Sequence, residues 1–375
     1  METKINNFGI SLENLVERQV FESLSNLSVN SAITSNIENY PIAIGTHPGN
    51  VRNRNEDRVA VAHIPSRNGN SYTLAIVCDG VGGSAYGDIA ASLVVTFFIS
   101  ELFELDEQKN LEYVIDSILR RIDEKVRVLL KGEGTTTVSA VLATREEFLG
   151  VNIGDSRVFS WDTKGNTAHQ ISEDDTLENE FKKNNIKDVA ALKIHNINNT
   201  LSQAIGERDR MSELLEVNFL LPSNFDKGIV LATDGAWKDT GEIFLSLLKQ
   251  APTSLDAVRR VLATATWCGG RDNITMLAIE DAKILQKISN ELKNEHDNFN
   301  WITVWIKNSK LKISCPEPIK PDNKLKSREK ASTLKFKTKN SRSIKNKNEN
   351  KKSNRMADFK VIIDQDSDKN SENND

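Results

Sequence analysis

Apolar runs separated by polar turns fill the middle of the chain, from about residue 40 to residue 280. The run Tyr72–Val77 has the length of a buried strand, and the following segment Cys78-Asp79-Gly80-Val81-Gly82-Gly83 predicts a sharp turn that presents Asp79 at the strand end. Comparable patterns predict further strands at 40–45, 58–64, 134–142, 148–153, 157–161, 228–233 and 274–279.

Helical periodicity follows the strand that ends at Asp79. The segment Ile89–Leu105 is apolar but interrupted by polar residues, which excludes a membrane span. The segment Leu111–Leu129 carries one apolar stripe, so we expect these two helices to cover one face of a sheet. Two shorter helices are predicted at 242–249 and 255–266.

Composition changes along the chain indicate four segments. Residues 1–38 form a polar N-terminal extension of unknown role with a weakly amphipathic piece at 12–27, and residues 39–281 form the ordered domain. Residues 282–318 are expected to be a helical and linker segment, whose apolar patch Trp301–Ile306 either packs on the domain or docks a partner. Residues 319–375, basic and then acidic, are expected to be a disordered tail. The charged segment Ser172–Asn199 is expected to be a mobile surface insertion.

Overall composition is that of an ordinary globular protein. The 375 residues are 38% hydrophobic and 27% charged with a net charge of −4, which gives no general bias toward nucleic acid. Three scattered cysteines without a C-x-x-C pair suit a reducing compartment, and the N-terminus lacks a secretory signal pattern. We expect a cytoplasmic monomer.

Acidic residues recur at strand ends and in glycine-bearing turns. One aspartate after a strand is commonplace, since Asp favours turns and helix caps. Several carboxylates at one sheet edge would repel each other unless cations neutralise them, and oxygen ligands without nearby His or Cys favour Mg²⁺ or Mn²⁺ over Zn²⁺. The set comprises Glu56, Asp57, Asp79, Asp155, Asp234 and Asp272.

The order of these motifs resembles the signature of the metal-dependent protein serine/threonine phosphatases of type 2C, and nearest their bacterial branch. Each motif alone is a weak match, whereas the ordered set over about residues 40–281 is specific. The motifs are Gly49-x-Val51-Arg52-x-x-Asn55-Glu56-Asp57, Asp79-Gly80-x-Gly82-Gly83, Gly134-Thr135-Thr136, Gly154-Asp155-Ser156-Arg157, Thr233-Asp234-Gly235 and Asp272-Asn273-Ile274-Thr275. The resemblance implies an α+β fold: a four-layer α-β-β-α sandwich of two antiparallel sheets flanked by helices.

The resemblance also implies a role for each acidic position. Asp79 would bridge two Mn²⁺ or Mg²⁺ ions, with Asp234 and Asp272 completing the shell of one ion. Glu56 and the Gly80 carbonyl would serve the other ion, and Asp57 would hold its water molecules. A water between the two ions would then attack the phosphoserine or phosphothreonine monoester directly, without a protein nucleophile.

Two further residues, Arg52 and Asp155, each have two possible roles. Arg52 matches the phosphate-binding arginine of the family, but without the motif it could equally form a surface ion pair. Asp155 matches a residue that helps to bind a third metal ion together with the counterpart of Asp234, and the alternative is a turn-capping aspartate.

The sequence departs from the family pattern at two places. Val81 stands where many eukaryotic members have a proton-donating histidine, so the proton for the leaving alcohol must come from elsewhere, such as water. Asp174-Asp175-Thr176 replaces a common Asp-His-Ser, which leaves substrate contacts there open. His47 lies near Arg52 in sequence, but a lone loop histidine is more often a surface residue.

Rival functions have weaker support. A thiol phosphatase needs an arginine one loop length after its cysteine, and neither Cys78 nor Cys268 has that arrangement. The glycines after Asp79 lack the lysine of a P-loop. The alternative is a catalytically silent protein of the same fold that binds phosphoproteins as a regulator, yet no metal carboxylate is missing. Expected partners are phosphoprotein substrates, a cognate Ser/Thr kinase system, and a weak anionic partner for the basic tail.

Overall fold

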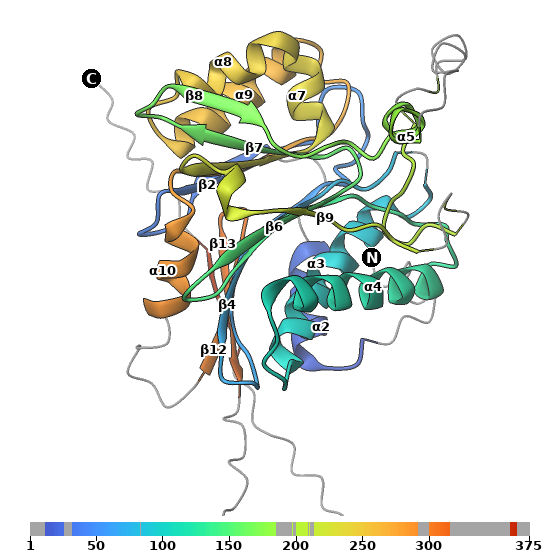
Figure 1. Cartoon of the computed structure of the whole chain (residues 1–375), viewed down its shortest axis with the longest axis vertical. Coiled ribbons are helices and arrows are strands. Elements are labelled where there is room, and N and C mark those ends of the chain that lie inside the picture. The colour runs from blue at the N-terminus through green and yellow to red at the C-terminus, as the bar shows by residue number, and fades with distance from the viewer. Residues whose placement is uncertain are drawn as a thin grey trace, which may run out of the picture.

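Two antiparallel β-sheets pack face to face in the computed structural model of the chain, with helices on both outer faces (Figure 1). The structure describes residues 12–25, 32–82, 84–184, 197, 200–208, 210, 214–291, 300–315 and 361–365. The α+β sandwich expected from the resemblance is confirmed.

The larger sheet has eight strands, and each neighbouring pair is antiparallel. Its central strands β3 and β4 pair from Arg58 opposite Cys78 to Pro65 opposite Ser71. In spatial order the strands are β14 (Val361–Gln365), β13 (Ser309–Cys315), β12 (Asn300–Ile306), β3 (Arg58–Pro65), β4 (Ser71–Cys78), β5 (Val138–Ala143), β6 (Phe148–Ile153) and β9 (Asn218–Leu220).

The smaller sheet has six antiparallel strands. In spatial order they are β1 (Ile33–Asn36), β2 (Ile42–His47), β11 (Ile274–Ile279), β10 (Gly228–Ala232), β7 (Arg157–Asp162) and β8 (Thr167–Gln170). Its inward-facing side chains, such as Ile44 and Leu231, pack against Val61 and Val77 of the larger sheet. This contact between the sheets forms the central core.

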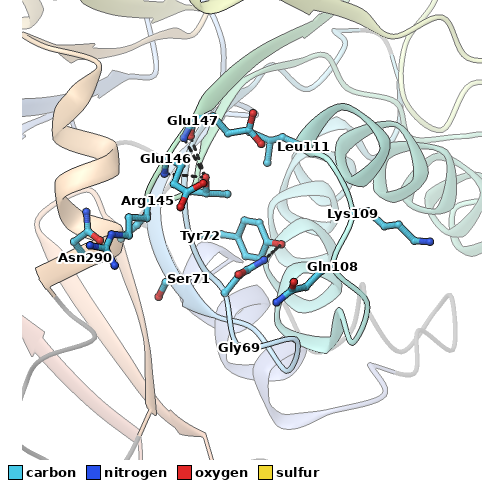
Figure 2. Close-up of a pocket in the computed structure, with 13 residues that line it drawn as sticks. Gly69, Ser71, Tyr72, Gln108, Lys109, Leu111, Arg145, Glu146, Glu147 and Asn290 are labelled. Atoms are coloured by element: carbon cyan, nitrogen blue, oxygen red, sulfur yellow. Dashed lines mark hydrogen bonds between the residues drawn. The ribbon is translucent and has the colours of Figure 1, made fainter.

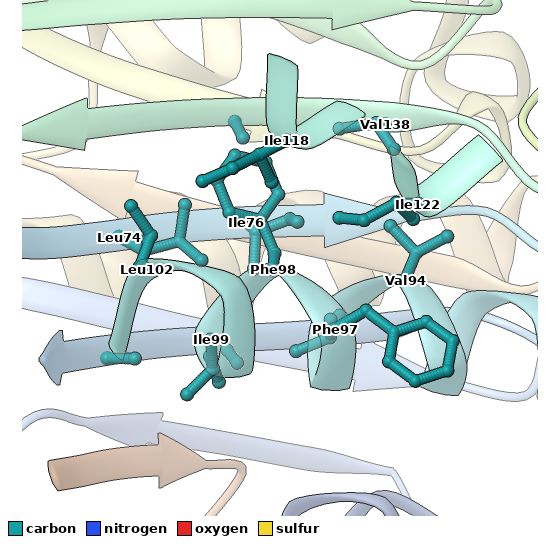
Figure 3. Packing of buried hydrophobic residues seen from close by; sticks show 14 of the residues in the cluster. Leu74, Ile76, Val94, Phe97, Phe98, Ile99, Leu102, Ile118, Ile122 and Val138 are labelled. Carbon is teal, nitrogen blue, oxygen red and sulfur yellow. The ribbon is translucent and has the colours of Figure 1, made fainter. Parts of the chain in front are cut away.

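The outer face of the larger sheet is covered by α2 (Leu15–Ser25), α3 (Gly87–Glu104) and α4 (Leu111–Leu129). Figure 3 shows Phe98 of α3 and Ile118 of α4 packed over Leu74 and Ile76 of β4. The predicted covering of one sheet face by two long helices is therefore confirmed. None of the helices in the described part of the chain is both long and apolar enough to cross a membrane.

The remaining helices cover the smaller sheet or flank the sandwich. The outer face of the smaller sheet packs against α7 (Asp234–Thr240), α8 (Phe244–Lys249) and α9 (Ser254–Trp267). The helix α10 (Lys283–Glu291) places Leu285 and Ile288 in the core between the sheets. Shorter helical elements are α5 (Leu177–Lys183) and the 3₁₀ turns Pro222–Asn224 and Gly241–Ile243.

The N-terminal extension differs from the expectation of a separate segment. The helix α2 buries Val16, Val20, Phe21 and Leu24 against α3, because its apolar stripe matches the outer face of that helix. The strand β1 adds to the edge of the smaller sheet through β2. Residues before position 38 therefore pack against the same domain as the residues after it.

The segment after residue 281 also differs from the expected linker. The apolar patch Trp301–Ile306 lies in β12, which pairs with both β3 and β13, so it packs on the domain. The strand β14, within the tail that was expected to be disordered, pairs with β13. The basic part of the tail, residues 320–355, lies outside the described residues.

Candidate active site

The strand ends of both sheets bring the predicted carboxylates together. Asp57 precedes β3 and Asp79 follows β4, and the pairing of Arg58 with Cys78 places these two aspartates at the same sheet edge. In the smaller sheet, Asp234 follows β10 and Asp272 precedes β11, which are also paired. The Thr233 hydroxyl donates a hydrogen bond of 2.9 Å to Asp57 Oδ2 and thereby links the two sheet edges.

Asp79 is fixed through its backbone. Its N–H donates to Thr137 Oγ1 (3.0 Å), and its carbonyl accepts from the Thr136 hydroxyl (2.7 Å) and the Thr137 N–H (2.9 Å). Burial raises the pKa of the Asp79 carboxyl well above its usual range, and the nearby carboxylates of Asp57, Asp234, Asp155 and Asp272 raise the pKa further. The ionised form of Asp79 is therefore disfavoured here, and a nearby cation would stabilise it.

Asp57 is buried, and its Oδ1 atom has no hydrogen-bond partner among the described residues. Burial raises the pKa of its carboxyl to about 7, although hydrogen bonds from Thr275 and Thr233 oppose this effect. A buried carboxylate oxygen without a donor is costly unless an unseen water or ion satisfies it. The Oδ1 atom of Asp57 thus has an unused acceptor position for such a group.

The backbone of Glu56 is held by the side chain of Asn273. The Glu56 N–H donates to Asn273 Oδ1 (2.8 Å), while Asn273 Nδ2 donates to the carbonyls of Pro48 (2.8 Å) and Arg54 (2.9 Å). Burial raises the pKa of Glu56, with a second contribution from Asp88. Gly80 lies against this loop, and a Cβ there would lie 2.9 Å from the Glu56 carbonyl oxygen and 2.5 Å from the carbonyl carbon of Gly87.

Arg52 lies at the exposed mouth of the site. Its Nη2 donates to Asp272 Oδ2 at 2.7 Å, and that hydrogen bond, with the nearby acidic charges, raises the pKa of the guanidinium. The guanidinium lies over Gly82, where a Cβ would be 3.0 Å from both terminal nitrogens. Glycine at position 82 therefore gives Arg52 the space to reach the carboxylates.

Lys238 is a site residue that the sequence reasoning missed. Its ammonium donates to Asp234 Oδ2 (2.6 Å) and to Asp155 Oδ2 (3.1 Å), so one cation joins two of the predicted carboxylates. The signal in the sequence was the four-residue spacing from Asp234, which becomes meaningful only once a helix starts at Asp234. Asp155 is thus an ion-pair partner in this structure.

Within the described ranges, no three His, Cys, Asp or Glu side chains are arranged around one point as ligands, and Arg52 and Lys238 pair with the carboxylates instead. The donor chemistry still fits hard divalent cations, because all candidate ligands are oxygens, Asp57 Oδ1 is unsatisfied and the Asp79 pKa is raised. The predicted ligands are Glu56, Asp57, Asp79, the Gly80 carbonyl, Asp234 and Asp272, and all of them offer oxygen donors.

Other candidate residues have structural roles. His47 Nδ1 accepts a hydrogen bond of 2.9 Å from the Gly49 N–H, and burial lowers the pKa of its imidazole. Asp175, at the position of the family histidine, is buried and accepts from Gly154 N (2.8 Å), Gln203 (2.8 Å) and Asn218 (2.9 Å). Burial raises the pKa of the Cys78 thiol, which does not suit a nucleophile.

The segment 172–199 differs in part from the expected mobile insertion. Residues 172 and 174–176 are buried. Arg157 donates to Asp174 from Nε, at 3.0 Å to Oδ1 and 3.1 Å to Oδ2, and from Nη2, at 2.7 Å to Oδ2. The helix α5 follows, and none of its residues is buried. Residues 185–196, 198 and 199 lie outside the described residues.

Two cavities lie at opposite ends of the larger sheet. One of about 640 Å³ opens near the start of β4, where Tyr72 and Gln108 line it (Figure 2). Because β4 has eight residues at about 3.3 Å each, roughly 25 Å separates this cavity from Asp79. The other, of about 480 Å³, adjoins the carboxylates and is lined by Val51, Arg52, Asn53, Arg54, Glu56, Ser84 and Arg271. This second cavity suits an anionic substrate.

Known proteins match the region that contains these residues. The family described as Protein phosphatase 2C matches residues 44–274. The serine/threonine phosphatase stp of Listeria welshimeri is 29% identical over 253 residues, which cover 64% of this chain and 96% of the relative. The protein phosphatase PhpP of Streptococcus pneumoniae is 26% identical over 256 residues, which cover 64% of this chain and 99% of the relative.

The fold of a solved structure agrees with this match. The serine/threonine phosphatase Stp1 from Staphylococcus aureus covers 67% of this chain and 97% of its own, with a TM-score of 0.52 and 21% identity. Because the family match spans well over half of the chain and contains every predicted carboxylate, this chain belongs to the protein phosphatase 2C family.

Proposed function

We propose that the chain is a protein phosphatase that hydrolyses phosphoserine and phosphothreonine monoesters by direct attack of water at two Mn²⁺ or Mg²⁺ ions. The observation that carries the proposal is the convergence of Asp57, Asp79, Asp234 and Asp272 from two sheet edges within the region matched by the family. The names of the bacterial relatives support phosphoprotein substrates.

Each residue has a defined task in this proposal. Asp79, Asp234 and Asp272, with Glu56 and the Gly80 carbonyl, would hold the ions, and Asp57 would orient water through its unsatisfied Oδ1. When bound, the ions supply Lewis-acid stabilisation and an activated water for in-line displacement at phosphorus. Arg52 would exchange its Asp272 contact for two phosphoryl oxygens, for which its planar fork is suited.

The leaving alcohol must receive a proton from a group other than residue 81. The Val81 side chain has no proton to donate, and its backbone N–H is occupied by the Thr135 carbonyl at 3.0 Å. The second cavity, which Glu56 and Ser84 help to line, would give water access to the ester oxygen of a bound substrate. We therefore assign this proton to water.

The test is Mn²⁺-dependent phosphate release from a phosphothreonine peptide by the full chain. We expect turnover with Mn²⁺ and none with EDTA. Absence of turnover at saturating metal, with peptide binding intact, would show the catalytically silent alternative instead. A cytoplasmic location, a monomeric state, a cognate kinase system and an anionic partner for the basic tail stay predictions from the sequence.

A further inference from the structure

The ammonium of Lys238 lies between two carboxylates of the site. It is 2.6 Å from Asp234 Oδ2 and 3.1 Å from Asp155 Oδ2. Asp234 is the first residue of α7 and Lys238 is one turn later, so the helix itself directs the lysine back toward the strand ends. Asp155 reaches the same point from the turn between β6 and β7.

The surroundings hold Lys238 in this position. The Trp237 ring lies 5.2 Å from the ammonium and is covered on one face by the Arg157 guanidinium, 3.3 Å from the ring centre. Arg157 is anchored in turn by Asp174. An ammonium held between two carboxylates carries its positive charge at neutral pH, as an ordinary lysine does.

This arrangement conflicts with the third metal ion that the resemblance implies at Asp155 and Asp234. A divalent ion there would have to share Asp155 and Asp234 with the Lys238 ammonium, which already lies within hydrogen-bond distance of both carboxylates. Two positive charges at that separation repel strongly in a half-buried site. The lysine already supplies the neutralisation that the ion would provide.

We propose that the Lys238 ammonium takes the place of a third metal ion, so that this chain binds two divalent ions and keeps Asp155 outside the metal shell. Lys238 is then a positioning residue: it fixes one oxygen of Asp234 and leaves the other for an ion. The inference rests on the proposed two-ion centre.

The experiment is a count of bound Mn²⁺ per chain, by equilibrium dialysis and elemental analysis. We expect two ions in the wild type and three in Lys238→Met, which keeps the length of the side chain but removes its charge. Adding Asp155→Asn to Lys238→Met should return the count to two. The control Lys182→Met removes a comparable i,i+4 pair with Glu178 on α5 and should leave two ions.

The outcomes separate this inference from the proposed function. Three ions in the wild type, or two in a folded Lys238→Met variant, would overturn the role of Lys238. No bound Mn²⁺ in the wild type would instead overturn the metal centre itself. If Lys238→Met does not fold, Asp155→Asn alone decides: a count of two, as in the wild type, supports the inference, and a loss of one ion relative to the wild type overturns it.

Discussion

Asn273 connects three parts of the active site through one buried side chain. It binds the carbonyls of Pro48 and Arg54 and the N–H of Glu56, so the loop that carries Arg52 and Glu56 is fixed to the start of β11. The neighbouring Asp272 is thereby placed beside that loop. The geometry of the site depends on this amide as well as on the carboxylates.

We predict that Asn273→Ala destabilises the protein by about 1–3 kcal/mol, because the backbone partners of its amide lose their hydrogen bonds in a buried place. Urea unfolding measures the change. The matched control is Asn290→Ala, whose side-chain amide donates to the Gln286 carbonyl within α10. Equal stabilities for the two variants would contradict the role of Asn273.

The sequence predicts where the carboxylates of the site lie better than it predicts which residues bind them. Asp79 and Asp234 follow apolar runs, so their place at strand ends is a local property of the chain. The contact of Lys238 with Asp155 joins residues 83 positions apart, and that of Asn273 with Glu56 joins residues 217 positions apart. No local pattern in the sequence predicts these long-range contacts. Gly235 indicated a turn after Asp234, whereas α7 begins there and needs glycine because a Cβ would lie 2.1 Å from the Asn273 carbonyl oxygen.

At the scale of elements, the hairpin of β12 and β13 extends the larger sheet beyond β3. Its apolar side chains are buried on both faces: Ile302 and Val304 pack with the outer helices, and Trp305 packs in the core between the sheets. The sequence shows the apolar patch but not its partner, because β12 and β3 are more than two hundred residues apart. Pairing over such a distance has no local signature.

We predict that Ile302→Ala lowers the free energy of unfolding by about 2–5 kcal/mol, because it leaves a cavity in a fully buried place. The control Ile363→Ala lies on β14, where the side chain is 55% exposed, and should change stability by at most about 0.5 kcal/mol. Chemical denaturation compares the two. An unchanged Ile302→Ala variant would mean that the hairpin is not part of the cooperative domain.

At the scale of the whole molecule, buried ionisable groups couple stability to pH. His63 lies in the centre of the larger sheet on β3, and burial lowers the pKa of its imidazole to about 4. Its Nε2 atom is 2.9 Å from the Ser71 hydroxyl. The folded protein therefore keeps this histidine neutral at pH values where the unfolded chain binds a proton.

We predict that the free energy of unfolding falls as the pH drops from about 6.5 to about 4, since only the unfolded chain takes up a proton at His63 over that range. The contribution is up to about 3 kcal/mol for a pKa lowered from 6.5 to about 4. Urea unfolding at several pH values should show a smaller loss for His63→Gln. The same loss in both proteins would contradict the prediction.

The central claim is that Asp79 joins two ions at the point where both sheets end. It is tested most directly by phosphate release from a phosphothreonine peptide as free Mn²⁺ is raised, for the wild type and for Asp79→Asn. We predict saturable, EDTA-sensitive release by the wild type and a loss of at least about 100-fold in the folded variant, or about 2.7 kcal/mol. Wild-type turnover in Asp79→Asn, or release that continues in EDTA, would contradict the account.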